Sequence, residues 1–326
     1  MSVERDPMPL PGNGTGTAIE ETILPVVTNL KSISDYSLDM AREVFHRKGI
    51  MLFRGIETSV DDFYQLARTF SVHLLVDPGN ERTGGSRYSE IQSVTVGSDA
   101  IGFHREYGPQ ILAPDLIMFY CERPPLERGQ TTLADGIAVW DRLSDETKAL
   151  LGKRKIKYYN RYPISECLDY LGIPYRSGWE TELRDTLAMF GEFELKFLHD
   201  AIELTHTEHP VVWHDACQRP CFVSSFLPGV YNALVCTFDN GDPLPEQLIS
   251  EISSAMESCA VEVDWQENDV VVIDNARWFH GRRPFHGNER KILNAVGYSR
   301  FRVLPPEQID RIARISKAAG LKSNGA

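Results

Sequence analysis

A histidine and a glutamate stand two positions apart in the segment "GFHREYGPQ" (residues 102–110), among aromatic side chains. In a β-strand, residues i and i+2 point to the same face. His104 and Glu106 would therefore aim an imidazole nitrogen and a carboxylate at one point, while Arg105 turns away. Such triplets are also common on solvated strand faces. A metal site here requires a third ligand from elsewhere in the chain, and a group that holds a substrate beside the metal.

The segment "DVVVIDNARWFHGRRPFHGNERKIL" (residues 269–293) offers both. Its apolar strand runs into a turn that delivers His280, and Arg290 follows at the start of another apolar strand. Two imidazoles and one carboxylate from distant strands form the 2-His-1-carboxylate facial triad of non-haem Fe(II) oxygenases, which leaves coordination positions open. An arginine at this offset can pair bidentately with the distal carboxylate of a 2-oxo acid that chelates the iron.

These segments resemble the taurine dioxygenase and clavaminate synthase-like superfamily of Fe(II)/2-oxoglutarate-dependent oxygenases. The resemblance covers roughly residues 40–302. It begins with a helix followed by "GIMLFRGI", continues through "GFHREYGPQILAPDLIMFYCERPPLERGQTTLADGIAVWDRLS", and ends with "DNARWFHGRRPFHGNERKI". The resemblance implies that His104, Glu106 and His280 bind iron. It also implies that Arg290 and Thr131 bind 2-oxoglutarate, since Thr131 falls where the family places a hydroxyl on the co-substrate carboxylate.

Two positions depart from the commoner family pattern. The acidic ligand is Glu106 rather than aspartate, which resembles the clavaminate synthase side of the superfamily, whose members often act on amino acids. Some relatives carry a second basic residue four positions after the co-substrate arginine, and here that position is Asn294. The co-substrate carboxylate at the iron end must then be held by other groups.

Short β-rich runs dominate the chain after residue 90, separated by turn residues. Helical periodicity predicts helices at residues 36–49, 59–70, 137–152, 190–201 and 244–258. Many short strands with inserted helices predict a mainly β fold with helical insertions around a double-stranded β-helix (jelly-roll) core. The expected organisation is a flexible N-terminal arm (1–20), an oxygenase domain (21–302), and a C-terminal helix and tail (303–326).

The substrate side is the least specified part of the sequence. Residues 157–182 are aromatic and poor in periodicity, as lids over active sites often are, and residues 81–90 resemble a second mobile flap. Aromatic residues beside the expected ligands pack in the core and shield the metal. Polar residues of the 157–182 segment can reach a substrate. The resulting substrate-contact candidates are Phe103, Asn160, Arg161 and Trp278.

Composition excludes several other classes of protein. The net charge of −12 over 326 residues argues against a nucleic-acid surface, which needs clustered Lys and Arg. No apolar run is as long as a membrane span, and the start of the chain lacks the apolar region of a signal peptide, so a cytoplasmic protein is expected. Six thinly spread cysteines suggest reduced thiols. His214, Cys217 and Cys221 lack the partner pair of a structural zinc site and predict a polar turn.

The resemblance implies an Fe(II)/2-oxoglutarate-dependent dioxygenase that uses O2 on an unactivated C–H bond of a small molecule. An amino acid, an amino acid on a carrier protein, or another natural-product intermediate remains open as substrate, as do hydroxylation, desaturation or cyclisation and the oligomeric state. A halogenase would leave the carboxylate position to a halide, and Glu106 fills that position. A non-catalytic sensor with a jelly-roll fold is a further alternative, which Arg290 and Thr131 disfavour.

Overall fold

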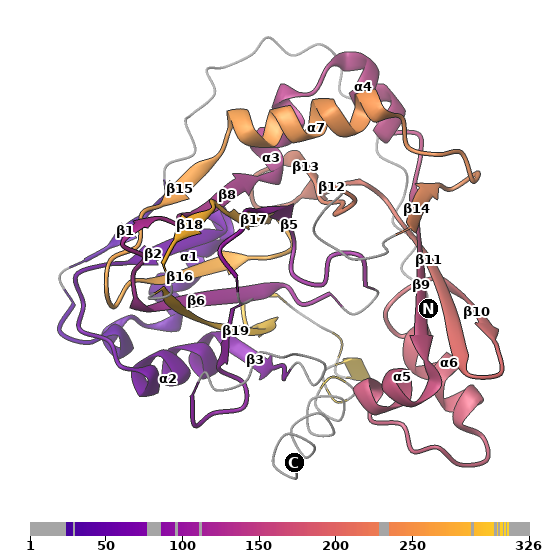
Figure 1. Ribbon diagram of the computed structural model, residues 1–326, viewed down its shortest axis with the longest axis horizontal. Helices are drawn as coiled ribbons and strands as arrows, with labels where there is room; N and C mark the ends of the chain where they lie inside the picture. The colour runs from indigo at the N-terminus through magenta and orange to yellow at the C-terminus, as the bar shows by residue number, and fades with distance from the viewer. Residues whose placement is uncertain are drawn as a thin grey trace.

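A large sheet forms one wall of the core in this computed structural model. The structure describes residues 24–312, except 29, 77–85, 95–96, 111–112, 228–234, 288–289, 303–304, 306, 309 and 311. The sheet order is β1 (Val26–Val27), β2 (Ile50–Phe53), β16 (Val270–Asp274), β6 (Leu116–Arg123), β19 (Lys291–Ser299) and β3 (Ser71–Leu74), with β4 (Gln92–Ser93) also paired to β19. Strands from both ends of the sequence are therefore neighbours (Figure 1).

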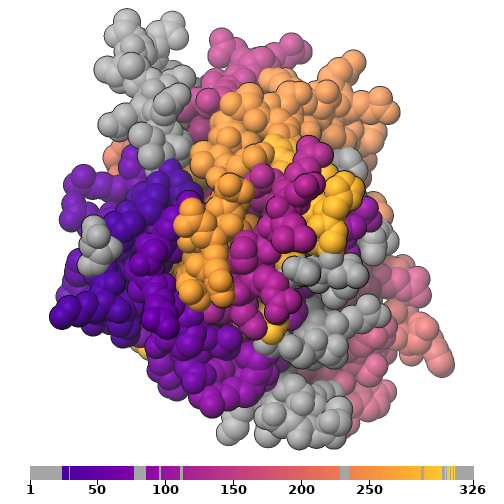
Figure 2. Space-filling model, turned by 60° about the vertical axis from the view of Figure 1, so that its left-hand side comes forward, coloured from indigo at the N-terminus to yellow at the C-terminus, as the bar shows by residue number. Residues whose placement is uncertain are grey.

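A smaller sheet faces it, in the order β15 (Val261–Val263), β8 (Thr131–Asp135), β17 (Trp278–Arg282) and β5 (Ile101–His104). Strand alternation explains the packing between the two. Val271 and Ile273 of β16 point inward and share a buried cluster with Leu133 and Trp278 of the small sheet. In Figure 2, a band of orange residues lies between indigo and magenta residues, so segments far apart in the sequence meet on this face. Among such contacts is the pairing of β15 with β8.

Helices cover the outer faces of both sheets. α1 (Leu38–Lys48) and α2 (Val60–Phe70) cover the large sheet, where Phe45 and Phe63 pack with Val270 and Val272, the outward-pointing residues of β16. On the small sheet lie α3 (Gly136–Arg142), α4 (Asp145–Leu151) and α7 (Glu246–Ser258), at the opposite side of the molecule from α2 (Figure 1). Capping residues determine where these helices begin. For example, the Ser59 side chain caps α2 by accepting from the backbone N–H of Asp62.

An insertion between α4 and α7 stands beside the two sheets (Figure 1). Its own sheet has the order β10 (Phe193–Phe197), β11 (Ala201–Glu208), β9 (Ile156–Pro163) and β14 (Val235–Phe238). α5 (Ile164–Leu171) and α6 (Trp179–Ala188) contribute to a separate apolar cluster with this sheet. Residues 157–182 are therefore largely regular structure. The helix predicted at 190–201 is wrong: "FELKF" alternates with the period of a strand and forms β10.

The remaining short elements are η1 (Ile33–Asp35), β7 (Glu127–Arg128), β18 (Phe285–His286) and the hairpin of β12 (Val211–His214) with β13 (Arg219–Phe222). The expected mainly β fold with helical insertions and a jelly-roll core is confirmed. Residues 1–20, 81–85 and nearly all of 303–326 lie outside the described residues, so the predicted arm, flap and tail, with the domain limits, stay predictions. Within the described part of the chain, no helix is long and apolar enough to cross a bilayer.

Candidate metal centre

Strand pairing in the small sheet brings two histidines together. β17 and β5 are antiparallel, and His280 is the direct register partner of His104, with ring centroids 4.2 Å apart. Glu106 completes the group: its Oε2 lies 3.5 Å from Nε2 of His280 and 3.9 Å from Nε2 of His104. One ligand atom from each residue lies within 4.8 Å of the others. Across the described residues, this is the one group of three or more His, Cys, Asp or Glu side chains arranged to share a metal ion.

Glu106 reaches this point by a different route from the one that strand alternation predicts. β5 ends at His104, and Glu106 lies in the turn that follows, where Tyr107 has φ 53° in the left-handed region. Asn275 fixes that turn: its Oδ1 accepts from the Glu106 amide at 2.7 Å, and its Nδ2 donates to the Glu106 carbonyl at 2.9 Å. The same Nδ2 donates to the Pro114 carbonyl at 2.7 Å. The position of the Glu106 carboxylate therefore depends on a residue that is distant in the sequence.

The donor set suits Fe(II). Nδ1 of His104 lies 2.9 Å from the Gly102 carbonyl oxygen, which can only accept, so Nδ1 carries the proton. Nε2, the ring nitrogen on the side of Glu106, therefore keeps its lone pair for a metal ion. Glu106 and His280 are 7% and 5% exposed, and the rings of Phe119 and His280 pack edge to face with their centroids 5.4 Å apart. Two imidazole nitrogens, one carboxylate and a largely dry surrounding match a 2-His-1-carboxylate iron site.

Arg105, between His104 and Glu106 in the sequence, connects this turn to the insertion. Its amide donates to Ser225 Oγ at 3.1 Å, and its Nη2 lies 3.8 Å from Oε2 of Glu208, at the end of β11. Glu208 also accepts from the hydroxyls of Tyr158 and Ser224 at 2.9 and 3.0 Å. Burial raises the pKa of the Glu208 carboxyl, which the Arg105 charge and these hydroxyls oppose. The sequence alone gave no sign that Glu208 and Tyr158 belong beside the ligand turn.

A second group of residues forms what we call the arginine cradle: Arg282, Phe285 and Arg290. The guanidinium carbons of Arg290 and Arg282 lie 5.6 and 5.3 Å from the centroid of the same Phe285 ring. Nε of Arg290 is buried and has no hydrogen-bond partner among the described residues. Burial, and next the positive charge of Arg282, lower the pKa of Arg290 to about 10, so it remains a cation at neutral pH. A buried cation with an unused donor is suited to binding an anion.

Thr131 borders the arginine cradle. On the paired strands β8 and β17 it stands directly opposite Arg282, and both side chains are buried. The indole N–H of Trp265 donates to Thr131 Oγ1 at 3.1 Å. Because an acceptor role of the hydroxyl is thereby used, its hydrogen can be donated to a carboxylate. The sequence signal for Arg282 was its spacing of two residues from His280 on one strand, which places both on the same face.

The four substrate-contact candidates differ in how they lie relative to the turn that carries Glu106. Asn160 donates to the carbonyl of Pro109 at 3.3 Å, in the turn that follows Glu106. Phe103 packs in the core beneath α7, and Trp278 donates its indole N–H to the Lys48 carbonyl at 2.8 Å. Arg161, 62% exposed, lies 3.9 Å from Asp200. Of the four, Asn160 is the one that these contacts connect to the ligand turn, and all four assignments stay predictions.

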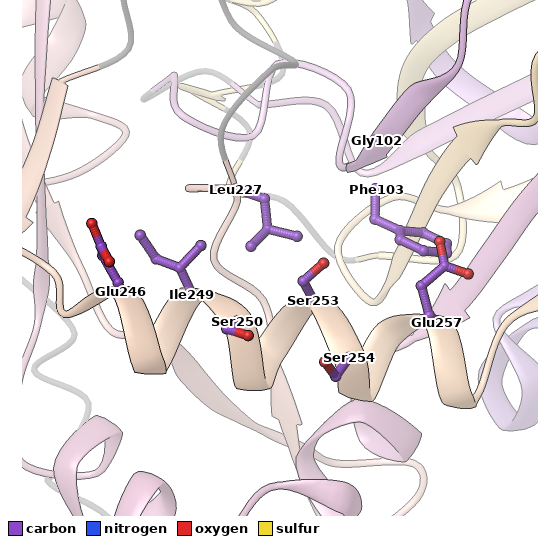
Figure 3. A pocket seen from close by; sticks show the side chains of 9 residues that line it. All are labelled: Gly102, Phe103, Leu227, Glu246, Ile249, Ser250, Ser253, Ser254 and Glu257. Atoms are coloured by element: carbon purple, nitrogen blue, oxygen red, sulfur yellow. The ribbon is translucent and has the colours of Figure 1, made fainter.

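A cavity of about 490 Å³ lies along α7 and is distinct from the metal centre (Figure 3). Leu227, Gly102 and Phe103 line one side, and α7 side chains such as Ser250 and Ser253 line the other. Since consecutive strand residues point to opposite faces, Phe103 faces this cavity while His104 faces Glu106 and His280. The cavity therefore lies on the outer side of the small sheet.

Comparison with known proteins identifies the family of the chain. The model of the taurine catabolism dioxygenase TauD, TfdA family matches residues 18–296. The chain is 23% identical to the dapdiamide synthesis protein DdaC of Enterobacter agglomerans over 81% of this chain and 88% of that protein. It is 24% identical to a clavaminate synthase-like protein of Arabidopsis thaliana, over 83% and 87% of the two chains.

The fold is also similar to that of a taurine dioxygenase from Burkholderia xenovorans. The TM-score is 0.56 at 12% identity, over 89% of this chain and 92% of that one. At this identity the likeness concerns the fold, whereas the family match spans most of the sequence. The superfamily resemblance of the sequence is thereby confirmed. The chain belongs to the taurine catabolism dioxygenase TauD, TfdA family and is a dioxygenase that uses Fe(II), 2-oxoglutarate and O2.

Proposed function

We propose that His104, Glu106 and His280 hold Fe(II), and that Arg290 and Thr131 hold the distal carboxylate of 2-oxoglutarate. The observation that carries the proposal is the convergence of the three ligand atoms within 4.8 Å in a buried setting. The orphaned Nε of Arg290 and the donor hydroxyl of Thr131 support the second half. Neither feature is needed by a bare metal site.

The overall reaction consumes O2 and 2-oxoglutarate and acts on an unactivated C–H bond. When bound, the iron with its co-substrates supplies an oxidant strong enough to remove that hydrogen, and one oxygen atom of O2 enters succinate. In hydroxylation, the other oxygen atom enters the product as C–OH, and CO2 is released from 2-oxoglutarate. Desaturation or cyclisation would instead remove a second hydrogen from the substrate and release water. Aromatic residues such as Phe119 exclude water from the ligand face.

We propose a small-molecule substrate, either an amino acid or a natural-product intermediate. Glu106 as the acidic ligand supports this class through the resemblance to clavaminate synthase. One relative is named for dapdiamide synthesis and another is described as clavaminate synthase-like. An amino acid attached to a carrier protein is the alternative form of the same substrate.

The test is succinate release by protein supplied with Fe(II), 2-oxoglutarate and O2, alone and with a panel of free amino acids. A turnover increase with one panel member, and a product 16 mass units heavier, would identify hydroxylation. His286→Ala is a suitable control, because His286 is exposed and lies outside the ligand group. A protein that binds Fe(II) and 2-oxoglutarate but releases no succinate with any substrate, free or carrier-bound, would instead fit a sensor.

A further inference from the structure

Phe285 is the uncharged residue of the arginine cradle. It stands midway between His280 and Arg290 in the sequence, so one short segment connects a proposed iron ligand to the proposed co-substrate arginine. Phe285 is buried, and the guanidinium carbon of Arg290 lies over its ring, 5.6 Å from the centroid. A cation within about 6 Å of the centroid of an aromatic ring, over its face, is attracted by the ring. The ring therefore contributes to holding the Arg290 guanidinium.

The main chain around Phe285 is fixed by its neighbours. Phe285 on β18 pairs with Arg128 on β7, and its N–H donates to the Ser98 carbonyl at 3.0 Å. The N–H of Gly129 donates to the carbonyl of Pro284 at 3.3 Å. Gly129 also approaches so closely that a Cβ added to it would lie 3.0 Å from Cβ of Phe285. Because the main chain is anchored and the side chain is buried, the ring keeps a defined position.

An aromatic ring differs from a hydrogen-bonding partner because it leaves the N–H donors of an arginine available. Arg283 shows the other arrangement: it donates to Glu257 at 2.9 and 2.8 Å and to Glu262 at 2.6 Å, so its donors are used by the protein. Nε of Arg290 is buried and makes no hydrogen bond with a described residue. A guanidinium that lies over a ring can use the donors at its planar edge for a bidentate pair with a carboxylate.

Arg282 lies over the same ring but is also held by other groups. Its guanidinium carbon is 5.3 Å from the centroid, and its Nε and Nη2 donate to the Asp99 carbonyl at 3.2 and 2.8 Å. The negative charge of Asp99 acts on the same guanidinium. For Arg290, no hydrogen bond or ion pair of the guanidinium is found within the described part of the chain. The position of Arg290 therefore depends on Phe285 more than that of Arg282 does.

We infer that Phe285 is a positioning residue for 2-oxoglutarate: its ring holds the Arg290 guanidinium in place for a bidentate pair with the distal carboxylate. The inference rests on the proposed function, since it requires Arg290 to bind that carboxylate. An arginine that is held before binding loses less conformational freedom when the ligand arrives. This gain applies only to ligands with a second carboxylate. A monocarboxylic 2-oxo acid can chelate the metal but does not use Arg290.

The experiment compares two acids of equal chain length on Mn(II)-loaded protein, where calorimetry measures binding without turnover. 2-Oxoglutarate has the second carboxylate, and 2-oxopentanoate has a methyl group in its place. Phe285→Leu should weaken 2-oxoglutarate binding about five-fold, on the order of 1 kcal/mol, and leave 2-oxopentanoate binding and Mn(II) affinity unchanged. Phe285→Tyr keeps the ring and should bind 2-oxoglutarate like wild type. Phe197→Leu is the matched control and should change neither affinity, since Arg184 lies over the Phe197 ring at 5.0 Å on the insertion.

A double variant separates a role through Arg290 from general support of the site. In the Arg290→Ala background, Phe285→Leu should not weaken 2-oxoglutarate binding further, because the arginine that the ring positions is gone. The same selective loss without Arg290 would overturn the inference, as would equal weakening of both acids or a lower Mn(II) affinity. Unchanged 2-oxoglutarate binding in Phe285→Leu, or a loss in Phe285→Tyr as large as in Phe285→Leu, would overturn it too.

A second measurement does not depend on the folding of a Phe285 variant. NMR of wild-type protein loaded with Zn(II) should show an Arg290 side-chain resonance shifted by the ring current of Phe285, assigned by its loss in Arg290→Lys. An unshifted resonance contradicts the contact. Should Phe285→Leu fail to fold, Phe285→Met takes its place. Arg290→Ala alone decides the proposed function: unchanged 2-oxoglutarate binding contradicts the co-substrate site itself, whereas a failure confined to the Phe285 variants leaves that site in place.

Discussion

The side-chain amide of Asn275 holds the main chain of Glu106 at both ends, by accepting from its N–H and donating to its carbonyl. Asn275 is 1% exposed and directly follows β16, so these bonds join Glu106 to the end of a strand in the opposite sheet. The backbone N–H of Asn275 in turn donates to the carbonyl of Asp115, which anchors the asparagine itself. A carboxylate on a turn with a left-handed residue is thereby kept in one position.

Replacement of Asn275 should lower the affinity for the metal ion while the protein remains folded. Asn275→Ala removes all three side-chain bonds, and loss of such supporting groups lowers metal affinity roughly 10–100-fold. Asn275→Asp should do the same, because its second oxygen would face the carbonyls of Glu106 and Pro114. Titration with Mn(II), followed by the signal of the free ion, measures the effect, with Asn240→Ala as an exposed control. Equal Mn(II) affinity in wild type and Asn275→Ala would show that the turn holds itself.

Loss of either histidine ligand should abolish Fe(II) binding and turnover. His104→Ala and His280→Ala each leave two donors, which is too few to hold the ion against water. Circular dichroism should show a largely intact fold, since the apolar core between the sheets is unchanged. His286→Ala should behave like wild type in the same Fe(II) titration. Near-normal activity in either ligand variant is incompatible with the assigned triad.

Removal of Arg290 should raise the 2-oxoglutarate requirement steeply and spare the metal. Loss of a charge-assisted bidentate pair in a buried site costs about 2–5 kcal/mol, or roughly thirty-fold or more in affinity. The apparent KM for 2-oxoglutarate in the succinate assay measures this, with Arg283→Ala as control. An unchanged KM would move the role to another arginine.

The half-buried carboxyl of Asp274 predicts a pH dependence of stability. Burial, and next the charge of Asp115, raise its pKa from 3.8 to about 7. Since the folded state then holds a proton that the unfolded state has lost, this contribution to stability is complete below about pH 4 and is lost as the pH rises through 7. Asp274→Asn should therefore gain stability relative to wild type between pH 5 and pH 8, by roughly 1 kcal/mol or more. Urea unfolding at several pH values tests this against Asp264→Asn at the surface, and a pH-independent difference would contradict it.

Reactions run in the presence of halide ions distinguish halogenation from hydroxylation, desaturation or cyclisation. Because Glu106 is proposed to occupy the position that a halogenase leaves to chloride, products should carry oxygen, a double bond or a new ring. Mass spectrometry of reactions run with chloride and with bromide makes the comparison once a substrate is known. A halide-dependent mass shift in the wild-type product would remove Glu106 from the ligand set. Glu106→Gly is expected to lose Fe(II) rather than gain halogenation, because it also loses a charge that holds the ion.

Some features of this protein follow from the sequence because they depend on local pattern. The spacing of His104 and Glu106, the apolar run before His280 and the offset of Arg290 indicated an iron site with an acidic co-substrate. Period-two runs with inserted helices indicated the jelly roll. In each case, residues near in sequence determine the signal. The helix expected at 190–201 failed because a short amphipathic run such as "FELKF" takes its structure from its pairing with β11.

Tertiary structure decided what depends on contacts between distant segments. Glu106 is held by Asn275, and Arg105 reaches Glu208 on the insertion, although no local pattern links these residues. Arg282 and Arg283 are adjacent and chemically identical, yet one is buried beside Arg290 and the other is paired with surface glutamates. Strand alternation predicts that they point apart, but which face is buried is set by the partner elements. Burial and pairing are properties of the assembled sheets, so no pattern of neighbouring residues shows them.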